Sequence, residues 1–164
     1  MTIKYLALGF AIALCNLANA QQATIRNNYK DENGLPHLKI EREMIYTPGN
    51  NWLYNHHAAI IEFKGKLIAT WSNGMVDEDS PGQRVVFSVS DDFEHWSAPG
   101  IIAEPGKAAN GIQKVLTAAG LYKYKGTLVA YYGEYEKDRT HTHLWAKRST
   151  DGEIGAALLT CTSR

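Results

Sequence analysis

The feature that most constrains the fold is an internal repeat with a spacing of 61 residues. Shifted by that number, AAIIEFKGKLIATW (58–71) aligns with AGLYKYKGTLVAYY (119–132). Each copy has two apolar runs joined by Lys-Gly, a pattern typical of a β-hairpin with a tight turn. Related turn sequences, VSDDFEHW and STDGE, follow the two hairpins at nearly the same spacing. Similarity at a fixed spacing indicates a repeated structural unit rather than a chance likeness of two hairpins.

A unit of about 60 residues with roughly four strands has the size of a large β-propeller blade. Residues 38–46 alternate apolar and polar as a half-buried strand does, residues 84–90 are a β-branched run typical of a strand, and no long window has a helical period. The sequence therefore predicts an all-β protein whose residues 38–164 form about two four-stranded blades of a six- or seven-bladed propeller. This domain would be incomplete. We expect it to be the N-terminal part of a longer protein and inactive alone, with doubtful sequence in its last dozen residues.

The first twenty residues have the pattern of a secretory signal peptide. A lysine near the start precedes an apolar run, and Ala18 and Ala20 form an A-x-A type cleavage site. The apolar run is shorter than the roughly 20 residues that a membrane-spanning helix needs. We expect cleavage after Ala20, export of the protein, and a polar leader over residues 21–37. Only Cys161 would then remain, which excludes an intramolecular disulfide and a cysteine-based zinc site.

The charge balance excludes some classes of partner. The chain has 17 basic and 17 acidic side chains and no formal net charge. A nucleic-acid-binding protein normally has a basic surface and a high isoelectric point. The sequence thus predicts no nucleic-acid partner, and charge gives no reason to expect a membrane surface.

Two turns carry a family likeness. SVSDDFEHW and RSTDGE resemble the Asp-box, or BNR, turn of sialidase-like propellers, whose pattern is roughly S-x-D-x-G-x-x-W. Asp91 and Trp96 have the family's separation, although Phe93 replaces the glycine, and Ser149 and Asp151 fit the second copy. In such a turn the aspartate caps backbone N–H groups and the aromatic ring packs into the blade. The likeness therefore concerns the scaffold.

The resemblance implies a glycan-cleaving enzyme, and the order of the motifs agrees with it. It suggests an exo-acting, sialidase-type glycoside hydrolase on acidic glycans. Sialidases begin the first inner strand with an arginine that binds the substrate carboxylate, whereas Asn55-His56-His57 stands there in this chain. Because histidine offers one donor and titrates near neutral pH, it does not replace that arginine. The alternative is a uronate-cleaving lyase of the rhamnose–glucuronate type, which the resemblance associates with histidine and tyrosine.

Four residues are candidates for the chemistry. His56 and His57 open the first inner strand, where a neutral imidazole could remove a proton. Because side chains alternate along a strand, only one of the two is expected to face the cavity. In the acidic loop, Asp77 or Asp79 is the better candidate for a proton donor to a glycosidic oxygen, as the resemblance implies. A structural histidine and a solvated acidic loop are the alternatives.

Other polar residues are candidates for substrate binding or for metal ligation. We expect contacts to substrate from Asn55, Arg84, Tyr132 and Glu134. The spacing of His141 and His143 predicts one face of a strand, but no third metal ligand is identifiable. The acidic trio 77–79 could bind Ca²⁺ only if ligands converged from several directions. We therefore expect no metal and no cofactor.

A third function is a propeller that binds sugars without cleaving them. Aromatic side chains can stack on sugar rings without a catalyst, and four such residues lie in or near the predicted inner strands: Trp52, Trp71, Tyr131 and Tyr132. In all three cases the partner is a glycan.

Overall fold

The computed structural model describes residues 34, 41–49 and 51–152. By its contacts the chain divides into two units, Met1–Arg42 and Glu43–Arg164, and all the described strands belong to the second. The predicted signal peptide, most of the leader and the last twelve residues lie outside the described residues. Within the described ranges all regular structure is β-strand. No helix found there is long and apolar enough to cross a membrane.

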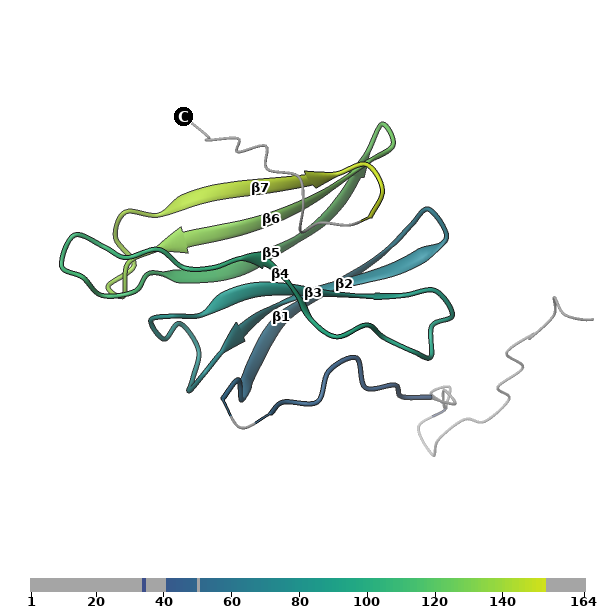
Figure 1. Cartoon of the computed structure of the whole chain (residues 1–164), viewed down its shortest axis with the longest axis horizontal. Coiled ribbons are helices and arrows are strands. Elements are labelled where there is room, and N and C mark those ends of the chain that lie inside the picture. The colour runs from purple at the N-terminus through teal and green to yellow at the C-terminus, as the bar shows by residue number, and fades with distance from the viewer. Residues whose placement is uncertain (1–33, 35–40, 50, 153–164) are drawn as a thin grey trace, which may run out of the picture. The chain divides into compact units, whose positions relative to one another are not determined.

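The first sheet is a four-stranded antiparallel meander (Figure 1). Its strands pair in chain order; they are β1 Tyr54–Phe63, β2 Lys66–Gly74, β3 Arg84–Ser90 and β4 Gly100–Ala103. The run predicted at 84–90 is thus a strand with the expected bounds. The second sheet is antiparallel as well and has three described strands, β5 Val115–Tyr124, β6 Thr127–Tyr135 and β7 His143–Ser149. This arrangement is consistent with one whole blade and most of another.

The sequence repeat corresponds to a structural repeat. Strands β5 and β6 begin and end 61 residues after β1 and β2. Both hairpins turn on the predicted Lys-Gly pair, and all four residues have positive φ, 52° and 79° in the first turn and 48° and 75° in the second. Positive φ at both central residues is the mark of a type I′ turn, whose twist matches that of the strands. The two tight hairpins are therefore confirmed.

The strand predicted at 38–46 is wrong for its described part. Residues 41–46 form no strand. Instead Ile45 and Tyr46 pack against a cluster of Ala69, Trp71 and Val86 on one face of the first sheet. The Tyr46 and Trp71 rings lie 5.5 Å apart. The alternation of apolar and polar residues shows that one side of the segment is buried. A half-buried segment can cover the face of a sheet without forming a strand that pairs with it.

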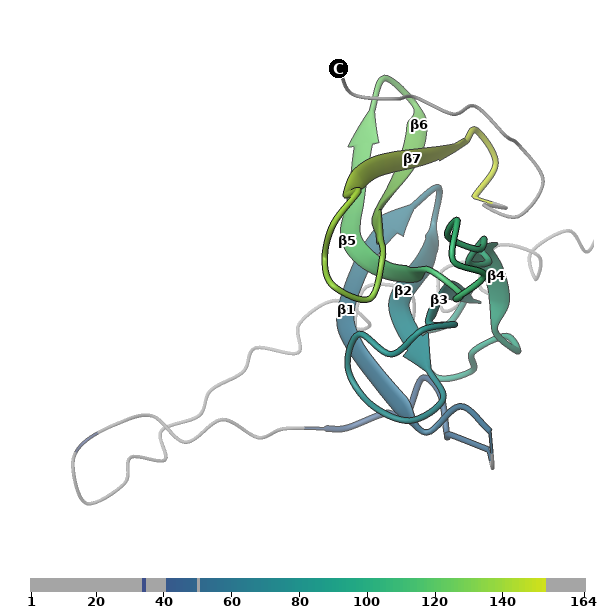
Figure 2. The same ribbon diagram turned by 90° about the vertical axis from the view of Figure 1, so that its left-hand side faces the viewer.

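The main core lies between the two sheets. Apolar side chains from both sheets share one cluster, with Ile68 and Val85 from the first and Leu116 and Leu128 from the second. Figure 2 shows the two sheets from the side. Main-chain hydrogen bonds also join them, from Leu116 N to Gln83 O over 3.0 Å and from Gly82 N to Lys114 O over 3.1 Å. The residues just before β3 therefore attach one sheet to the start of the other.

The turn after β3 differs in one residue from the predicted capping pattern. We expected Asp91 to cap the turn, but its exposed carboxylate pairs with Lys66 at 3.3 Å. Asp92 caps instead: its Oδ1 accepts from the backbone N–H groups of Glu94 and His95 over 2.9 and 2.7 Å. Ser90 Oγ bonds to Asp92 as Ser149 Oγ bonds to Asp151 in the second turn. The S-x-D element thus recurs, shifted by one residue from the predicted register in the first copy.

The hydrogen bonds of this turn raise the pKa of one histidine, His95, above its usual value. The hydrogen bond from His95 Nδ1 to Asp92, 2.7 Å long, and the charge of that carboxylate raise the pKa of His95 above 6.5. Backbone and side-chain hydrogen bonds from His95 lower the pKa of Asp92. The stabilisation linked to His95 is full below about pH 6.5 and is lost as the pH rises through its folded pKa, whereas that linked to Asp92 is lost as the pH falls through its own.

We expect an NMR titration of the ring protons to give His95 a pKa above 6.5, and Asp92→Asn to return it toward that value. If the pKa of His95 were the same in Asp92→Asn as in the unmodified protein, the pairing of His95 with Asp92 would be contradicted.

Candidate functional site

A β-bulge at the start of β1 brings two histidine rings to the same side. His56 pairs with Ser72 and Ala59 with Thr70, so that two residues, His57 and Ala58, stand opposite one. The φ of His57 is 54°, a left-handed conformation that histidine adopts more readily than most residues. The two imidazole centroids lie 4.1 Å apart. The bulge thus breaks the strict alternation on which the prediction for the two rings rested, and the rings lie side by side instead of on opposite faces.

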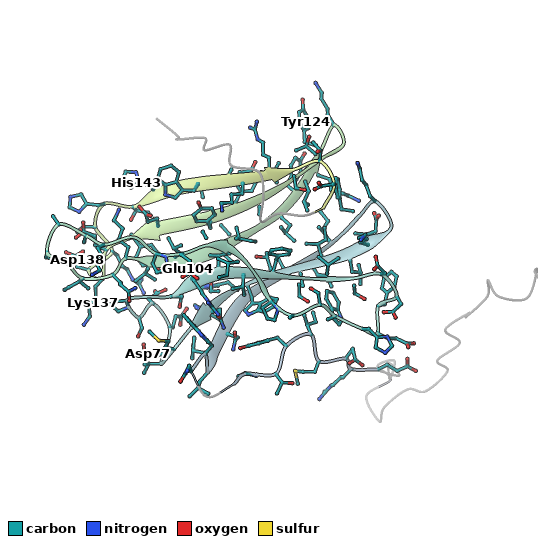
Figure 3. The ribbon with its side chains drawn as sticks, viewed as in Figure 1. Asp77, Glu104, Tyr124, Lys137, Asp138 and His143 are labelled. Atoms are coloured by element: carbon teal, nitrogen blue, oxygen red, sulfur yellow. The ribbon has the colours of Figure 1, made fainter. Side chains whose placement is uncertain are left out.

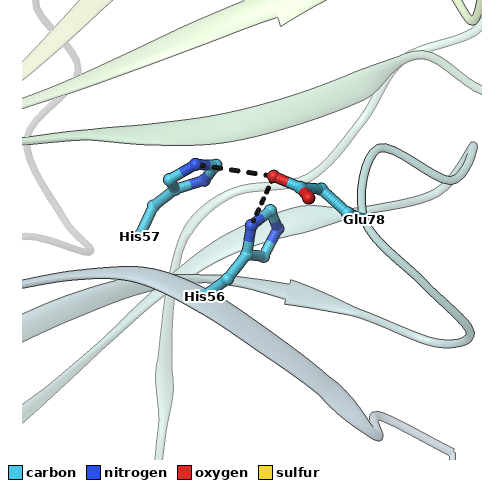
Figure 4. A group of neighbouring side chains, drawn as sticks. All are labelled: His56, His57 and Glu78. Carbon is cyan, nitrogen blue, oxygen red and sulfur yellow. Dashed lines mark ion pairs between the residues drawn. The ribbon is translucent and has the colours of Figure 1, made fainter.

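Glu78, in the loop between β2 and β3, completes the cluster (Figure 4). Its Oε1 lies 3.4 Å from Nδ1 of His56 and 3.8 Å from Nε2 of His57. His56 is mostly covered, with 14% of its side chain exposed, whereas His57 and Glu78 are 44% and 54% exposed. The cluster thus has one partly buried member and two exposed members that a ligand can reach. We call these three residues the His-His-Glu cluster.

The buried amide of Gln83 determines which nitrogen of His56 carries a proton. Gln83 Nε2 donates to the backbone carbonyl of Leu116 over 2.9 Å, and its Oε1 accepts from the backbone N–H of Asp79 over 3.3 Å. Oε1 is also 2.9 Å from His56 Nε2. Because this oxygen carries no hydrogen, Nε2 of His56 must be the donor. In the neutral ring Nδ1 therefore has a free lone pair.

That lone pair points toward a carboxylate oxygen. Two acceptors 3.4 Å apart repel each other unless something positive lies between them. A proton shared by the two atoms, or a cation bound by both and by His57, would remove that repulsion. Chemically, the cluster can hold and move a proton or bind a positive ion.

The two predicted acids of the loop bond to the protein rather than to the histidines. Asp79 accepts a hydrogen bond from the hydroxyl of Tyr135 and pairs with Arg139 at 3.0 Å. Asp77 accepts from Ser80 within its own loop. Burial, and next the bond to Asp79, raise the pKa of Tyr135 to about 12. Of the three neighbouring acids, the one beside the histidines is Glu78, which the sequence did not single out.

Asn55 and Arg84, predicted to bind substrate, take part in the scaffold. Asn55 Oδ1 accepts from Trp71 Nε1 over 2.9 Å and from the amide of Asn73 over 2.8 Å. Arg84 donates to Asn73 over 2.8 Å, and its guanidinium lies 3.6 Å from the centre of the Trp52 ring. These contacts hold the ends of β1, β2 and β3 together next to the cluster.

Tyr132 and Glu134 also contact protein. Tyr132 is 8% exposed and belongs to the core cluster, and burial raises the pKa of its hydroxyl. Glu134 pairs with Lys114 at 2.7 Å. Trp71 is 5% exposed, so two of the four aromatic residues proposed as sugar platforms are buried. Arg84 covers the face of a third, Trp52.

The second histidine pair does not share a strand face. His143 begins β7, but His141 precedes that strand and has a φ of 49°. His141 Nδ1 pairs with Glu136 at 3.1 Å. Figure 3 shows His143, Asp138 and Lys137 at the same end of the sheets as Asp77. The prediction of one strand face for His141 and His143 is therefore wrong.

Comparison with known proteins bears on the fold. The sequence matches no protein-family model and no curated protein. Two chains of solved structures match it. One, named Sialidase, has a TM-score of 0.55 and 19% identity over 70% of this chain and 13% of that chain. The fold is sialidase-like. At this identity the likeness shows the fold alone, and the chain spans a small part of the solved protein's length.

Within this sialidase-like fold, sequence reasoning missed Glu78 and Gln83. Glu78 lies between two other acidic residues, Asp77 and Asp79. Nothing in this short acidic run indicates that its middle carboxylate is the one beside the histidines. Gln83 had a weak signal, since an uncharged polar residue two positions before the apolar run VVFSV is a candidate for a buried hydrogen bond. Its partners are far along the chain at His56 and Leu116, so the signal did not name them.

Proposed function

We propose that this chain belongs to a carbohydrate-active protein that cleaves acidic glycans by β-elimination at a uronate, with the His-His-Glu cluster as its reacting groups. The observation that carries the proposal is the convergence of two imidazoles on one carboxylate at the start of β1. Removal of a proton beside a carboxylate needs a base with a pKa near neutrality, and histidine is the usual one.

The roles follow from exposure and hydrogen bonding. His57 is the more exposed ring, so it is the group that takes the proton from C5 of the uronate. The electrons of that C–H bond form the C4=C5 double bond while the bond from C4 to its oxygen breaks. The imidazolium of His57 then protonates the leaving oxygen, which balances the reaction without a further reactant. His56 and Glu78 position His57, and Gln83 holds His56.

A second candidate is sialidase-type hydrolysis, which the fold likeness favours. It needs a carboxyl pair, or a tyrosine activated by a carboxylate. The nearest tyrosine–acid pair to the acidic loop is Tyr135 with Asp79. However, a pKa of about 12 keeps the Tyr135 hydroxyl protonated near neutral pH. β-Elimination therefore accounts better than hydrolysis for the side chains at the site. We also propose that the protein is exported.

The test is an assay of the complete gene product on uronyl and sialyl glycosides. We expect ultraviolet absorbance from an unsaturated uronate on the uronyl substrates and no release of sialic acid. Release of sugar without a new double bond would favour hydrolysis. Binding of glycans without either signal would show that the protein is a sugar-binding propeller, and elimination would then be wrong.

A further inference from the structure

We infer that His56, His57 and Glu78 form a three-ligand site for a divalent transition-metal ion of the zinc class. The ligand atoms of these three residues all lie within 4.8 Å of one another. Two pairs are 3.4 and 3.8 Å apart. For metal–ligand bonds of about 2.0–2.1 Å in a tetrahedron, ligand atoms are roughly 3.3 Å apart. Only small side-chain movements would therefore close the site around an ion.

The surroundings of His56 match those of a metal ligand. A metal-binding histidine usually donates its second ring N–H to an oxygen, which fixes the tautomer and the ring orientation. Here Gln83 Oε1 accepts from Nε2 of His56 at 2.9 Å, and the Gln83 side chain is 1% exposed and held by Leu116. The free Nδ1 lone pair then points at Glu78. A cation between the two acceptors removes the repulsion between them.

The bulge supplies the second imidazole. On a regular strand His57 would point to the other face, but its φ of 54° brings the ring beside His56. Conformations of this kind are strained and are concentrated at functional sites. Two ring nitrogens and one carboxylate oxygen suit Zn²⁺ or Fe²⁺, whereas Ca²⁺ and Mg²⁺ prefer oxygen ligands alone. The exposed sides of His57 and Glu78 leave a further position open to a ligand.

This inference goes beyond the proposed function, and the two can fail separately. A bound ion uses the same lone pair of His57 that proton removal needs, so occupancy of the site would inhibit elimination. Metal binding itself does not require that the protein cleaves anything. It is therefore measured directly, apart from any assay of turnover.

The experiment titrates Zn²⁺ into the metal-stripped protein, by calorimetry and by competition with a chelating indicator dye. We expect one ion per chain, with affinity at least about tenfold weaker in His57→Ala and in Glu78→Gln, since each removes one of three ligands. The matched control is His143→Ala, a histidine outside the cluster, which should bind as the unmodified protein does. Co²⁺ replaces Zn²⁺ in a second titration, where the visible spectrum reports nitrogen ligation.

Three outcomes would overturn the inference. They are no binding by the unmodified protein, binding that His57→Ala and Glu78→Gln leave unchanged, and binding that His143→Ala removes. Circular dichroism of each variant shows whether it is folded. If His57→Ala were unfolded, Glu78→Gln would provide the test, because this residue is half exposed and the substitution keeps its shape.

Discussion

Replacing His57 with alanine is expected to lower the turnover of a uronyl glycan by the complete gene product by about 10²–10⁴-fold. A positioned general base contributes an effect of this size, and His57 is the more accessible of the two imidazoles in the cluster. The loss should appear in kcat rather than in KM, because the base acts on the transition state. Initial rates of double-bond formation measure it, with metal removed so that inhibition does not confuse the result.

The control for His57→Ala is His143→Ala, which replaces another exposed histidine and should leave kcat unchanged. His56→Ala offers a second comparison, because His56 is expected to position His57 and its loss should shift the pH profile as well as the rate. Full activity of His57→Ala would show that the base is elsewhere. Elimination by this cluster would then be wrong, even if the protein proved to be a lyase.

Replacing Gln83 with alanine is expected to lower the free energy of unfolding by about 2–4 kcal/mol. The buried amide bonds to His56, the Asp79 backbone and the Leu116 carbonyl. Its removal leaves buried polar groups without partners, at about 1–3 kcal/mol for each, and a small cavity. Relaxation of the neighbouring side chains and entry of water into the cavity limit the total loss of unfolding free energy. Urea unfolding of both proteins, compared through their midpoints and slopes, measures the change.

Gln113→Ala is the matched control, because this glutamine is exposed and substitutions at such positions usually change stability by less than about 0.5 kcal/mol. A loss of under 1 kcal/mol in Gln83→Ala would mean that the amide does not join the sheets as described. The same variant frees Nε2 of His56, so its ¹⁵N spectrum should show a change in the tautomer. An unchanged tautomer would contradict the role given to Gln83.

The sequence by itself determined the strands and the repeat. Apolar runs at 58–63 and 66–71 and the Lys-Gly turns specify local geometry, and the same pattern 61 residues later specifies it again. Such signals are local, because a tight turn and its two flanking strands depend on residues close along the chain. The alternation at 38–46 failed for a related reason. It reports half-burial, and only the sheet decides whether a half-buried segment pairs with it or covers it.

The site could be predicted only in part. The sequence identifies the double histidine as a candidate site, but strict alternation along a strand predicts that its two rings point to opposite faces. The bulge that unites them depends on how β1 pairs with β2, which the residues of β1 do not specify. Asp77 and Asp79 were preferred over Glu78 because charge and spacing do not distinguish three acids in a row.

Tertiary structure decided which polar residues meet. Gln83 lies 27 residues from His56 and 33 from Leu116 along the chain. The pairing of β1, β2 and β3 brings it to His56, and the packing of one sheet on the other brings it to Leu116. The same packing buries Tyr132. Pairing within the first sheet brings Asn55 and Arg84 to side chains of β2. Strand formation depends on short-range patterns that a sequence displays directly. The cluster of His56, His57 and Glu78 depends on one bulge and one loop conformation, and the folded chain alone sets these.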